Sequence, residues 1–198
     1  MNIKETSLSG NEFFYDGEEY KTNLVGIYQI YNAITAINAA RILKENGYVI
    51  SNGNIKNGIY TAKWPARFEI LRNNPTVIAD GSHNSDGMKA FVQTADKILK
   101  GKKVIAVFGM LKDKDYEFCL KELSSICDTV VITEVDNPRK ESAENLTECA
   151  KKYFKTVYTE KQNDLAVKKA LSLVGEDDVI IALGSLYMMD NIKKAVVK

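Results

Sequence analysis

Residues 64–84 read WPARFEILRNNPTVIADGSHN, and this stretch decides how the second part of the chain folds. Thr76–Ala79 is an apolar run with β-branched residues, which is typical of a buried strand. It ends in the polar loop Asp80–Asn84, and a helical pattern follows at once. Open α/β sheets bind ligands outside the carboxyl ends of their strands, where this loop stands. His83, the one histidine among 198 residues, lies in the same loop, so we predict a binding site there.

Strand-like and helix-like patterns alternate from this loop to the end of the chain. Apolar residues follow helical spacing between the strands, and the remaining buried strands are predicted at Lys103–Phe108, Thr129–Val135, Thr156–Thr159 and Val179–Leu183. Such alternation predicts a parallel sheet with right-handed crossovers.

The run Phe68–Leu71 precedes Thr76–Ala79 and is joined to it across Asn73-Asn74-Pro75. So short a connection favours an antiparallel pair. We therefore predict that residues 65–198 form one α/β domain. It has a Rossmann-like, mostly parallel sheet with one antiparallel edge strand, and helices on both faces.

Residues 1–64 follow another pattern. Asp16-Gly17 separates two strand-like runs and predicts a hairpin. A helix is expected from Ile27 to about Glu45, and Ser51 is positioned to cap a shorter second helix. A hairpin and two helices bury little, so we expect this segment to need a partner surface.

Charge and composition exclude several classes of protein. The 27 basic and 26 acidic residues leave a net charge of +1, which gives no reason to expect nucleic acid or an anionic membrane as a partner. The three cysteines lack metal-ligand spacing and are expected to be buried thiols. Neither a signal peptide nor an apolar run of about 20 residues is present, so we expect a cytoplasmic protein.

Polar residues at the predicted strand ends are the candidates for chemistry. In the Asp80–Asn84 loop, Asp80 can accept bonds from ribose hydroxyls, and His83 can stack on a base or bond to a carboxylate. Asp80 and Asn84 could instead only cap the next helix. Ser185 could bind an anion with the exposed N–H groups of a helix start, or simply cap it. Arg67 could reach a nucleotide, or pair with Glu69.

Several motifs of nucleotide, metal and hydrolase chemistry are absent from the sequence. It contains no phosphate loop of the G-x-x-x-x-G-K-[ST] type and no G-x-G-x-x-G fingerprint. It also lacks a clustered His, Cys and carboxylate set that would suggest zinc, and a nucleophile elbow.

The order and spacing of five motifs resemble folylpolyglutamate synthase, often bifunctional with dihydrofolate synthase, in the Mur ligase superfamily. The motifs are Gly26-x-Tyr28-Gln29-x-x-Asn32-Ala33, Trp64-Pro65-Ala66-Arg67-Phe68-Glu69, Asp80-Gly81-Ser82-His83-Asn84, Leu111-Lys112-Asp113-Lys114-Asp115-Tyr116 and Gly184-Ser185-Leu186-Tyr187. The resemblance runs from about residue 8 to the C-terminus. It departs from the family at Tyr28, where His is usual, and at Ala66, where Gly is usual.

The resemblance implies an ATP-dependent amide ligase that adds L-glutamate to the terminal carboxylate of a folate through an acyl phosphate. By motif, Asn32 would contact adenine, and Arg67 and Asp80 would hold the nucleotide. His83 and Ser185 would position the incoming glutamate. ATP and Mg²⁺ are the implied cofactors, with the magnesium ligands in a part of the enzyme that these residues lack.

The resemblance also implies that residues 1–64 are the C-terminal part of the ATPase domain of such an enzyme, and residues 65–198 its glutamate-ligating domain. We predict that the chain alone is inactive, because phosphoryl transfer needs the phosphate loop and metal. Two alternatives stay open. One is another ligase of the superfamily, of peptidoglycan or cyanophycin type. The other is a non-catalytic nucleotide-binding module.

Overall fold

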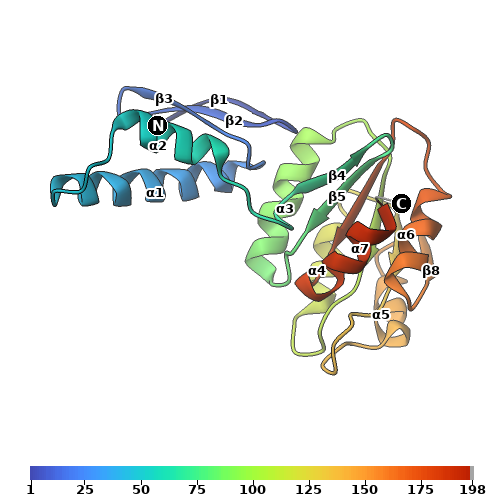
Figure 1. Ribbon diagram of the computed structural model, residues 1–198. Helices are drawn as coiled ribbons and strands as arrows, with labels where there is room; N and C mark the ends of the chain where they lie inside the picture. The colour runs from blue at the N-terminus through green and yellow to red at the C-terminus, as the bar shows by residue number, and fades with distance from the viewer. Residues whose placement is uncertain (197–198) are drawn as a thin grey trace. The chain divides into compact units, whose positions relative to one another are not determined.

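The computed structural model describes residues 1–196 (Figure 1), which form two compact units, Met1–Pro65 and the chain from Ala66 onward. Each unit has its own hydrophobic core. No helix among the described residues combines the length and apolar character needed to span a membrane.

The first unit opens with an antiparallel meander of three strands, β1 (Asn2–Ser7), β2 (Gly10–Tyr15) and β3 (Glu18–Thr22). The predicted hairpin is confirmed as β2 and β3, joined by Asp16 and Gly17 with positive φ angles of 51° and 77°. Strand β1 was not predicted, because its sequence NIKETS carries charges and lacks an apolar alternation.

Two helices complete this unit, α1 (Ile27–Glu45) and α2 (Asn52–Thr61), and both were predicted. Ser51 caps α2, with its hydroxyl accepting from the Asn54 N–H at 3.0 Å. The expectation that the unit buries little is consistent with its small core of buried side chains, which is made of Phe13, Tyr20, Ile30, Ala33, Ile37 and Ile55.

The second unit is built on a six-stranded sheet in the order β4-β5-β9-β6-β7-β8. Its strands are β4 (Glu69–Asn73), β5 (Thr76–Asp80), β6 (Val104–Phe108), β7 (Thr129–Ile132), β8 (Thr156–Thr159) and β9 (Val179–Leu183). All neighbours pair in parallel except β4 with β5. The predicted Rossmann-like sheet with one antiparallel edge strand is therefore confirmed.

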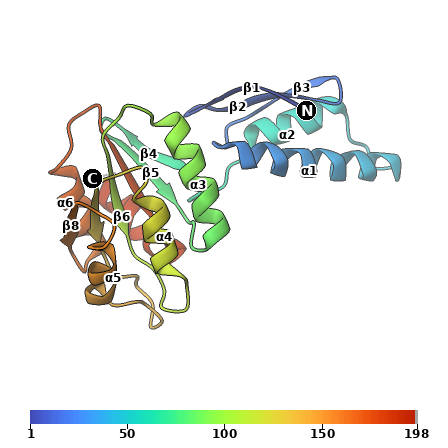
Figure 2. The same cartoon turned by 180° about the vertical axis from the view of Figure 1, so that it is seen from behind.

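Helices cover both faces of this sheet, as predicted. They are α3 (Ser85–Ile98), α4 (Tyr116–Leu123), α5 (Ala143–Ala150), α6 (Asn163–Leu171) and α7 (Met189–Val196), the last preceded by the short 3-10 helix η1 (Leu186–Met188). Helices α6 and α7 pack together on one face (Figure 1), whereas α3, α4 and α5 form a row on the other (Figure 2). Alternate strand residues, such as Val107 and Ile180, meet α6 and α7.

One predicted strand is too long. Thr129–Val135 was expected, but β7 ends at Ile132 because the next residues leave the ladder. Thr133 still donates its N–H to the Phe108 carbonyl oxygen at 2.9 Å, and Glu134 then turns toward the loop that follows β8. This departure opens space beyond the carboxyl end of β7.

All three cysteines are free and buried, as predicted. Burial raises the pKa of Cys119 and of Cys127 to about 12 and also raises that of Cys149. These thiols are part of the core rather than a redox site.

Candidate functional site at the carboxyl edge of the sheet

Asp80, the last residue of β5, is buried and holds two segments of chain together. One of its carboxylate oxygens accepts from the Phe68 N–H at 2.7 Å. The other accepts from the Ser82 N–H at 2.8 Å and from the Ser82 hydroxyl at 2.5 Å. Burial raises the pKa of Asp80, and the bonds from Ser82 and Phe68 oppose that rise. Asp80 therefore fixes the loop after β5 against residues 66–68.

The backbone on both sides of Arg67 is left-handed, with φ angles of 54° at Ala66 and 45° at Phe68. Such angles are uncommon for residues other than glycine. Carboxylates hold this turn, since Ala66 donates its N–H to Glu69 at 2.7 Å and Phe68 donates to Asp80. The Gly81 N–H donates to the Ala66 carbonyl oxygen at 2.8 Å. Glycine adopts a positive φ angle without strain, which explains why the family that the sequence resembles usually has glycine where this chain has Ala66. The turn also fixes the direction in which Arg67 leaves the backbone.

His83 is half-buried, and its Nδ1 lies 2.8 Å from the Gly81 carbonyl oxygen. A carbonyl oxygen accepts only, so Nδ1 carries the proton. In the neutral ring Nε2 is then the acceptor. The capping alternative holds for Asn84, whose side chain accepts from the Gly87 N–H at 2.8 Å at the start of α3, but not for Asp80.

The loop after β9 lies against the loops after β5 and β6. Gly184 has a φ of 111°, and a Cβ there would fall well inside van der Waals distance of the Gly109 carbonyl oxygen. A Cβ on Gly81 would likewise meet the Leu186 side chain. Ser185 is buried, and its hydroxyl accepts from the Tyr187 N–H at 3.3 Å, so it caps η1.

The structure thus brings Arg67, Asp80, His83 and Ser185 together on three adjoining loops at one edge of the sheet. Asn32 belongs to the first unit, where it is exposed on α1 and donates to the Gln29 side chain at 2.9 Å. Its predicted contact with adenine stays a prediction. Among residues 1–196, no cluster of three or more His, Cys, Asp or Glu side chains is arranged to hold a metal ion, so no step through magnesium is assigned to these residues.

The loops after β6 and β7 are joined to each other. Leu111 and Lys140 form a β-bridge, and Lys112 donates its N–H to the Arg139 carbonyl oxygen at 2.9 Å. Arg139 lies 3.6 Å from Asp113 in an exposed ion pair. Asp115 caps α4, so the charged loop after β6 is anchored at both ends.

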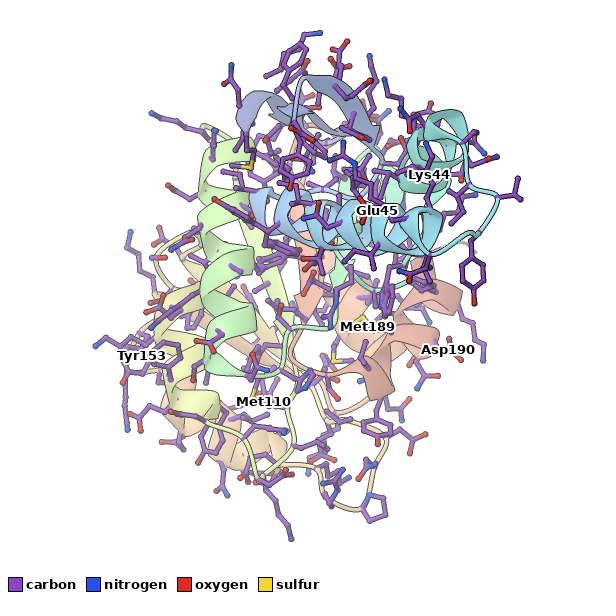
Figure 3. All side chains as sticks on the ribbon, turned by 90° about the vertical axis from the view of Figure 1, so that its left-hand side faces the viewer. Lys44, Glu45, Met110, Tyr153, Met189 and Asp190 are labelled. Atoms are coloured by element: carbon purple, nitrogen blue, oxygen red, sulfur yellow. The ribbon has the colours of Figure 1, made fainter. Side chains whose placement is uncertain are left out.

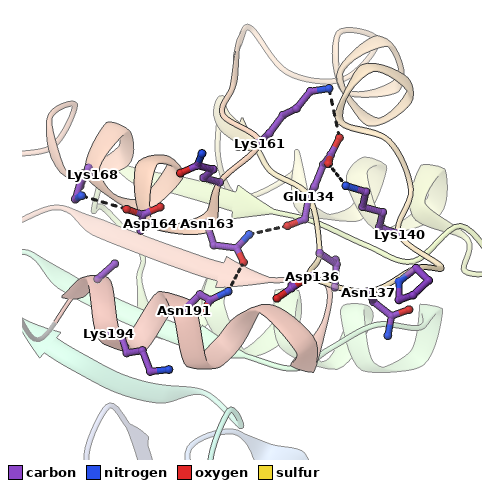
Figure 4. A pocket seen from close by; sticks show the side chains of 14 residues that line it. Glu134, Asp136, Asn137, Lys140, Lys161, Asn163, Asp164, Lys168, Asn191 and Lys194 are labelled. Atoms are coloured by element: carbon purple, nitrogen blue, oxygen red, sulfur yellow. Dashed lines mark hydrogen bonds and ion pairs between the residues drawn. The ribbon is translucent and has the colours of Figure 1, made fainter.

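A cleft of about 860 Å³ opens beyond the carboxyl ends of β7 and β8 (Figure 4). The helices that follow these two strands lie on opposite faces of the sheet, which makes this a topological switch point, where open α/β sheets bind ligands. Its lining includes four lysines, Lys140, Lys161, Lys168 and Lys194, together with acidic and amide side chains. The cleft could not be predicted from the sequence, because its walls come from three separate segments whose polar residues form no motif.

Hydrogen bonds of two amide side chains, Asn163 and Asn191, hold together the segments that line the cleft. Asn163 is buried and donates to the Thr133 hydroxyl at 3.0 Å and to the Glu134 carbonyl oxygen at 2.7 Å. Its own oxygen accepts from Asn191 on α7 at 3.3 Å. The start of α6, the end of β7 and α7 are thus held in register around the cleft.

Glu134 neutralises the lysines on one side of the cleft. It accepts from Lys140, it accepts from the Ala143 N–H at 3.2 Å, and it lies 3.7 Å from Lys161. The hydrogen bond from Lys140 is the main reason that the pKa of Glu134 lies below its usual value.

We expect Glu134→Gln to lower the free energy of unfolding at neutral pH by about 1 kcal/mol, because Lys140 and Lys161 lose the negative charge that they face. A carboxyl group with a lowered folded-state pKa stabilises the fold above its unfolded pKa of about 4.3, and this stabilisation is lost as pH falls through the folded-state value. Urea unfolding of both proteins across this range checks the prediction. A difference that persists in acid would contradict it.

Comparison with known proteins identifies several that are similar to this chain. The family model described as Mur ligase, glutamate ligase domain, matches residues 66–186. A dihydrofolate synthase/folylpolyglutamate synthase of Bacillus subtilis is 31% identical over 197 residues, covering 96% of this chain and 45% of that protein. A UDP-N-acetylmuramoyl-L-alanyl-D-glutamate–2,6-diaminopimelate ligase of Clostridium acetobutylicum is 32% identical, covering 92% of this chain and 39% of that protein.

A crystal structure of Mycobacterium tuberculosis folylpolyglutamate synthase, complexed with ADP and AMPPCP, superposes with a TM-score of 0.86 at 25% identity. The match covers 99% of this chain and 48% of that one. The chain thus spans less than half the length of these relatives. Since the family model covers more than half of the residues, the chain belongs to the Mur ligase family, with its glutamate ligase domain at residues 66–186.

Proposed function

We propose that this chain is the glutamate-ligating part of an ATP-dependent ligase that adds L-glutamate to the terminal carboxylate of a folate. The observation that carries the proposal is the meeting of Arg67, Asp80, His83 and Ser185 on adjoining loops at the carboxyl edge of the sheet. Relatives named folylpolyglutamate synthase match nearly the whole chain, which supports the choice of substrate.

In this proposal Arg67 contacts the nucleotide and Asp80 holds the turn that aims it. The Asp80 oxygens already accept three bonds from the chain, so its part in nucleotide binding is first to keep Arg67 in place. A turn that is already fixed loses little conformational entropy when the ligand binds. Asn32 keeps its proposed contact with adenine.

His83 and Ser185 take the amino acid. With its proton on Nδ1, His83 offers the Nε2 lone pair to an ammonium group. Ser185, at the start of η1, lies beside N–H groups suited to a carboxylate. In the overall reaction, the terminal phosphoryl group of ATP passes to a folate carboxylate oxygen and ADP leaves. The glutamate nitrogen then bonds to the acyl carbon, loses a proton and expels phosphate. The metal that such phosphoryl transfer requires belongs, in this proposal, to the rest of the ligase.

One alternative has specific support. The diaminopimelate ligase relative is as similar to this chain as the folate relative, so the amino acid could be diaminopimelate. Leu111–Asp115 and Gly184–Tyr187 are the motifs that favour the folate branch.

The test is a titration of the ¹⁵N-labelled chain with L-glutamate, and separately with D-glutamate and diaminopimelate, followed by amide chemical shifts. We expect L-glutamate to shift the loops Asp80–Asn84 and Gly184–Tyr187, and His83→Ala to weaken binding about tenfold or more. The matched control is Lys97→Ala, an exposed change on α3. Binding of diaminopimelate in preference to L-glutamate, or shifts confined to other loops, would overturn the proposal.

A further inference from the structure

The half-buried side chain of Arg67 makes no hydrogen bond or ion pair with any of the described residues 1–196. Arginine that is partly withdrawn from water is normally paired, because its charge loses solvation there. Two carboxylates, those of Glu69 and Asp80, flank the same turn and could each serve as a partner. The unpaired state of Arg67 therefore depends on what occupies these two groups.

The carboxylate of Asp80 is occupied by the chain itself. One of its oxygens accepts from the Phe68 N–H, and the other accepts from the N–H and the hydroxyl of Ser82. Burial raises the pKa of Asp80, and the bonds from Ser82 and Phe68 together with the nearby charge of Arg67 oppose this rise. Arg67 thus lies within electrostatic reach of Asp80 without bonding to it.

The carboxylate of Glu69 is occupied by a lysine from a distant segment. Its Oε2 accepts from the Ala66 N–H at 2.7 Å and lies 2.9 Å from the ammonium group of Lys193. Lys193 belongs to α7, the helix that begins at Met189, which Figure 3 labels. Each side chain of the pair is about one-third exposed, so water screens this pair less than a fully exposed one. The sequence allows Glu69 to pair with Arg67, but in the structure it pairs with Lys193.

We propose that Lys193 is a positioning residue that holds the Glu69 carboxylate and thereby keeps Arg67 free for the phosphate groups of the nucleotide. The next residue of α7, Ile192, is buried in the core, so the helix holds the ammonium group at a fixed place. An arginine without an internal partner binds phosphate oxygens without first breaking an ion pair. The nucleotide in this inference rests on the proposed function, whereas the choice of partner by Glu69 concerns this chain alone.

The first measurement follows the Nε–H resonance of Arg67 in the ¹⁵N-labelled chain, which Arg67→Lys assigns. Lys193→Met removes the ammonium group but keeps an unbranched side chain of similar length, so the fold should persist, and urea unfolding checks this. We expect Arg67 to pair with Glu69 in this variant, which shifts the resonance and raises its heteronuclear NOE. Lys193→Arg keeps the charge and should restore the parent spectrum.

The second measurement is a titration of the same proteins with ATP. We expect Lys193→Met to weaken ATP binding about fivefold, because Glu69 then competes for Arg67 with the strength of a surface ion pair. The double variant Lys193→Met/Glu69→Gln should bind ATP as the parent does. Glutamine still accepts from the Ala66 N–H but carries no charge to hold Arg67.

Two controls separate the loss of a partner from a general change of electrostatic potential. Lys97→Met removes one positive charge at an exposed position of α3 and should change neither measurement. Glu69→Gln alone should also leave ATP binding unchanged, because Arg67 is already free in the parent. A general effect of charge would instead make Glu69→Gln bind ATP more tightly than the parent.

Three results would overturn the proposal. The first is an Arg67 resonance in Lys193→Met that matches the parent. The second is a loss of ATP binding in Lys193→Met that Glu69→Gln does not reverse. The third is a Glu69→Gln variant that binds ATP more tightly than the parent. If ATP leaves the Arg67 resonance of the parent unmoved, the proposed function fails, and the nucleotide fails with it as the anion. The first measurement would still decide whether Lys193 keeps Arg67 unpaired.

Discussion

Gly184→Ala is expected to lower the free energy of unfolding by about 3 kcal/mol, among the largest losses from any single methyl group in this chain. Two effects add at this position. The φ angle of 111° lies where a residue with a Cβ is strained, and the new methyl group would collide with the Gly109 carbonyl oxygen. That oxygen belongs to backbone between β6 and its loop, so it cannot move without disturbing the sheet.

Gly101→Ala separates the two effects. Gly101 also has a positive φ, 82°, but nothing lies within 4 Å of the Cβ that alanine would add. We expect this variant to lose only about 1 kcal/mol, from backbone strain alone. Urea unfolding of both variants gives the comparison. Equal losses would mean that the loops after β9 and β6 are not in contact in solution.

Asp80→Ala should be nearly as damaging, at about 3 kcal/mol, because it leaves the N–H groups of Phe68 and Ser82 buried without an acceptor. Removing a buried charge offsets part of this loss. The left-handed turn around Arg67 also loses one of its two carboxylate acceptors. Asp80→Asn keeps one side-chain oxygen as an acceptor, so its free energy of unfolding should fall by less. Unfolding in urea measures the loss in both variants.

The pH dependence of stability tests whether burial dominates the electrostatics of Asp80. Burial raises the folded-state pKa of Asp80 above its unfolded value of about 3.9. A group with a raised pKa contributes stability that is fully present below the unfolded pKa and is lost as pH rises through the folded value. The stability of the parent relative to Asp80→Asn should therefore increase as pH falls from neutral toward 3.9. A decrease would mean that the bonds from Phe68 and Ser82 outweigh desolvation.

The fold of the second unit could be predicted because its signals are local. Each buried strand is a short apolar run, and the helix after Asp80–Asn84 repeats its apolar residues with a period that only a helix buries. Strand β1 escaped prediction because it is polar and pairs at the edge of a small meander. The end of β7 was misplaced because Thr133 and Val135 are β-branched residues, which favour a strand, although the ladder ends at Ile132.

The site could be predicted only in part. Residues at strand ends could be named, since parallel strands bring their carboxyl ends to one edge. The role of Asp80 as an acceptor for the Phe68 N–H could not be predicted, because it depends on the left-handed turn at Ala66 and Phe68. The cleft beyond β7 and β8 depends on Asn163 meeting Thr133, which lies 30 residues away.

The buried cysteines have a practical consequence. The thiolate is the reactive form of cysteine, and a thiol with a pKa of about 12, as at Cys119 and Cys127, is almost wholly protonated at neutral pH. Cys149 is also buried, with its pKa raised. The folded protein therefore offers reagents almost no native thiol. A single cysteine introduced at an exposed position, such as Thr35, would take up a fluorescent or spin label by itself, so ligand binding near that position could be followed without first removing the natural cysteines.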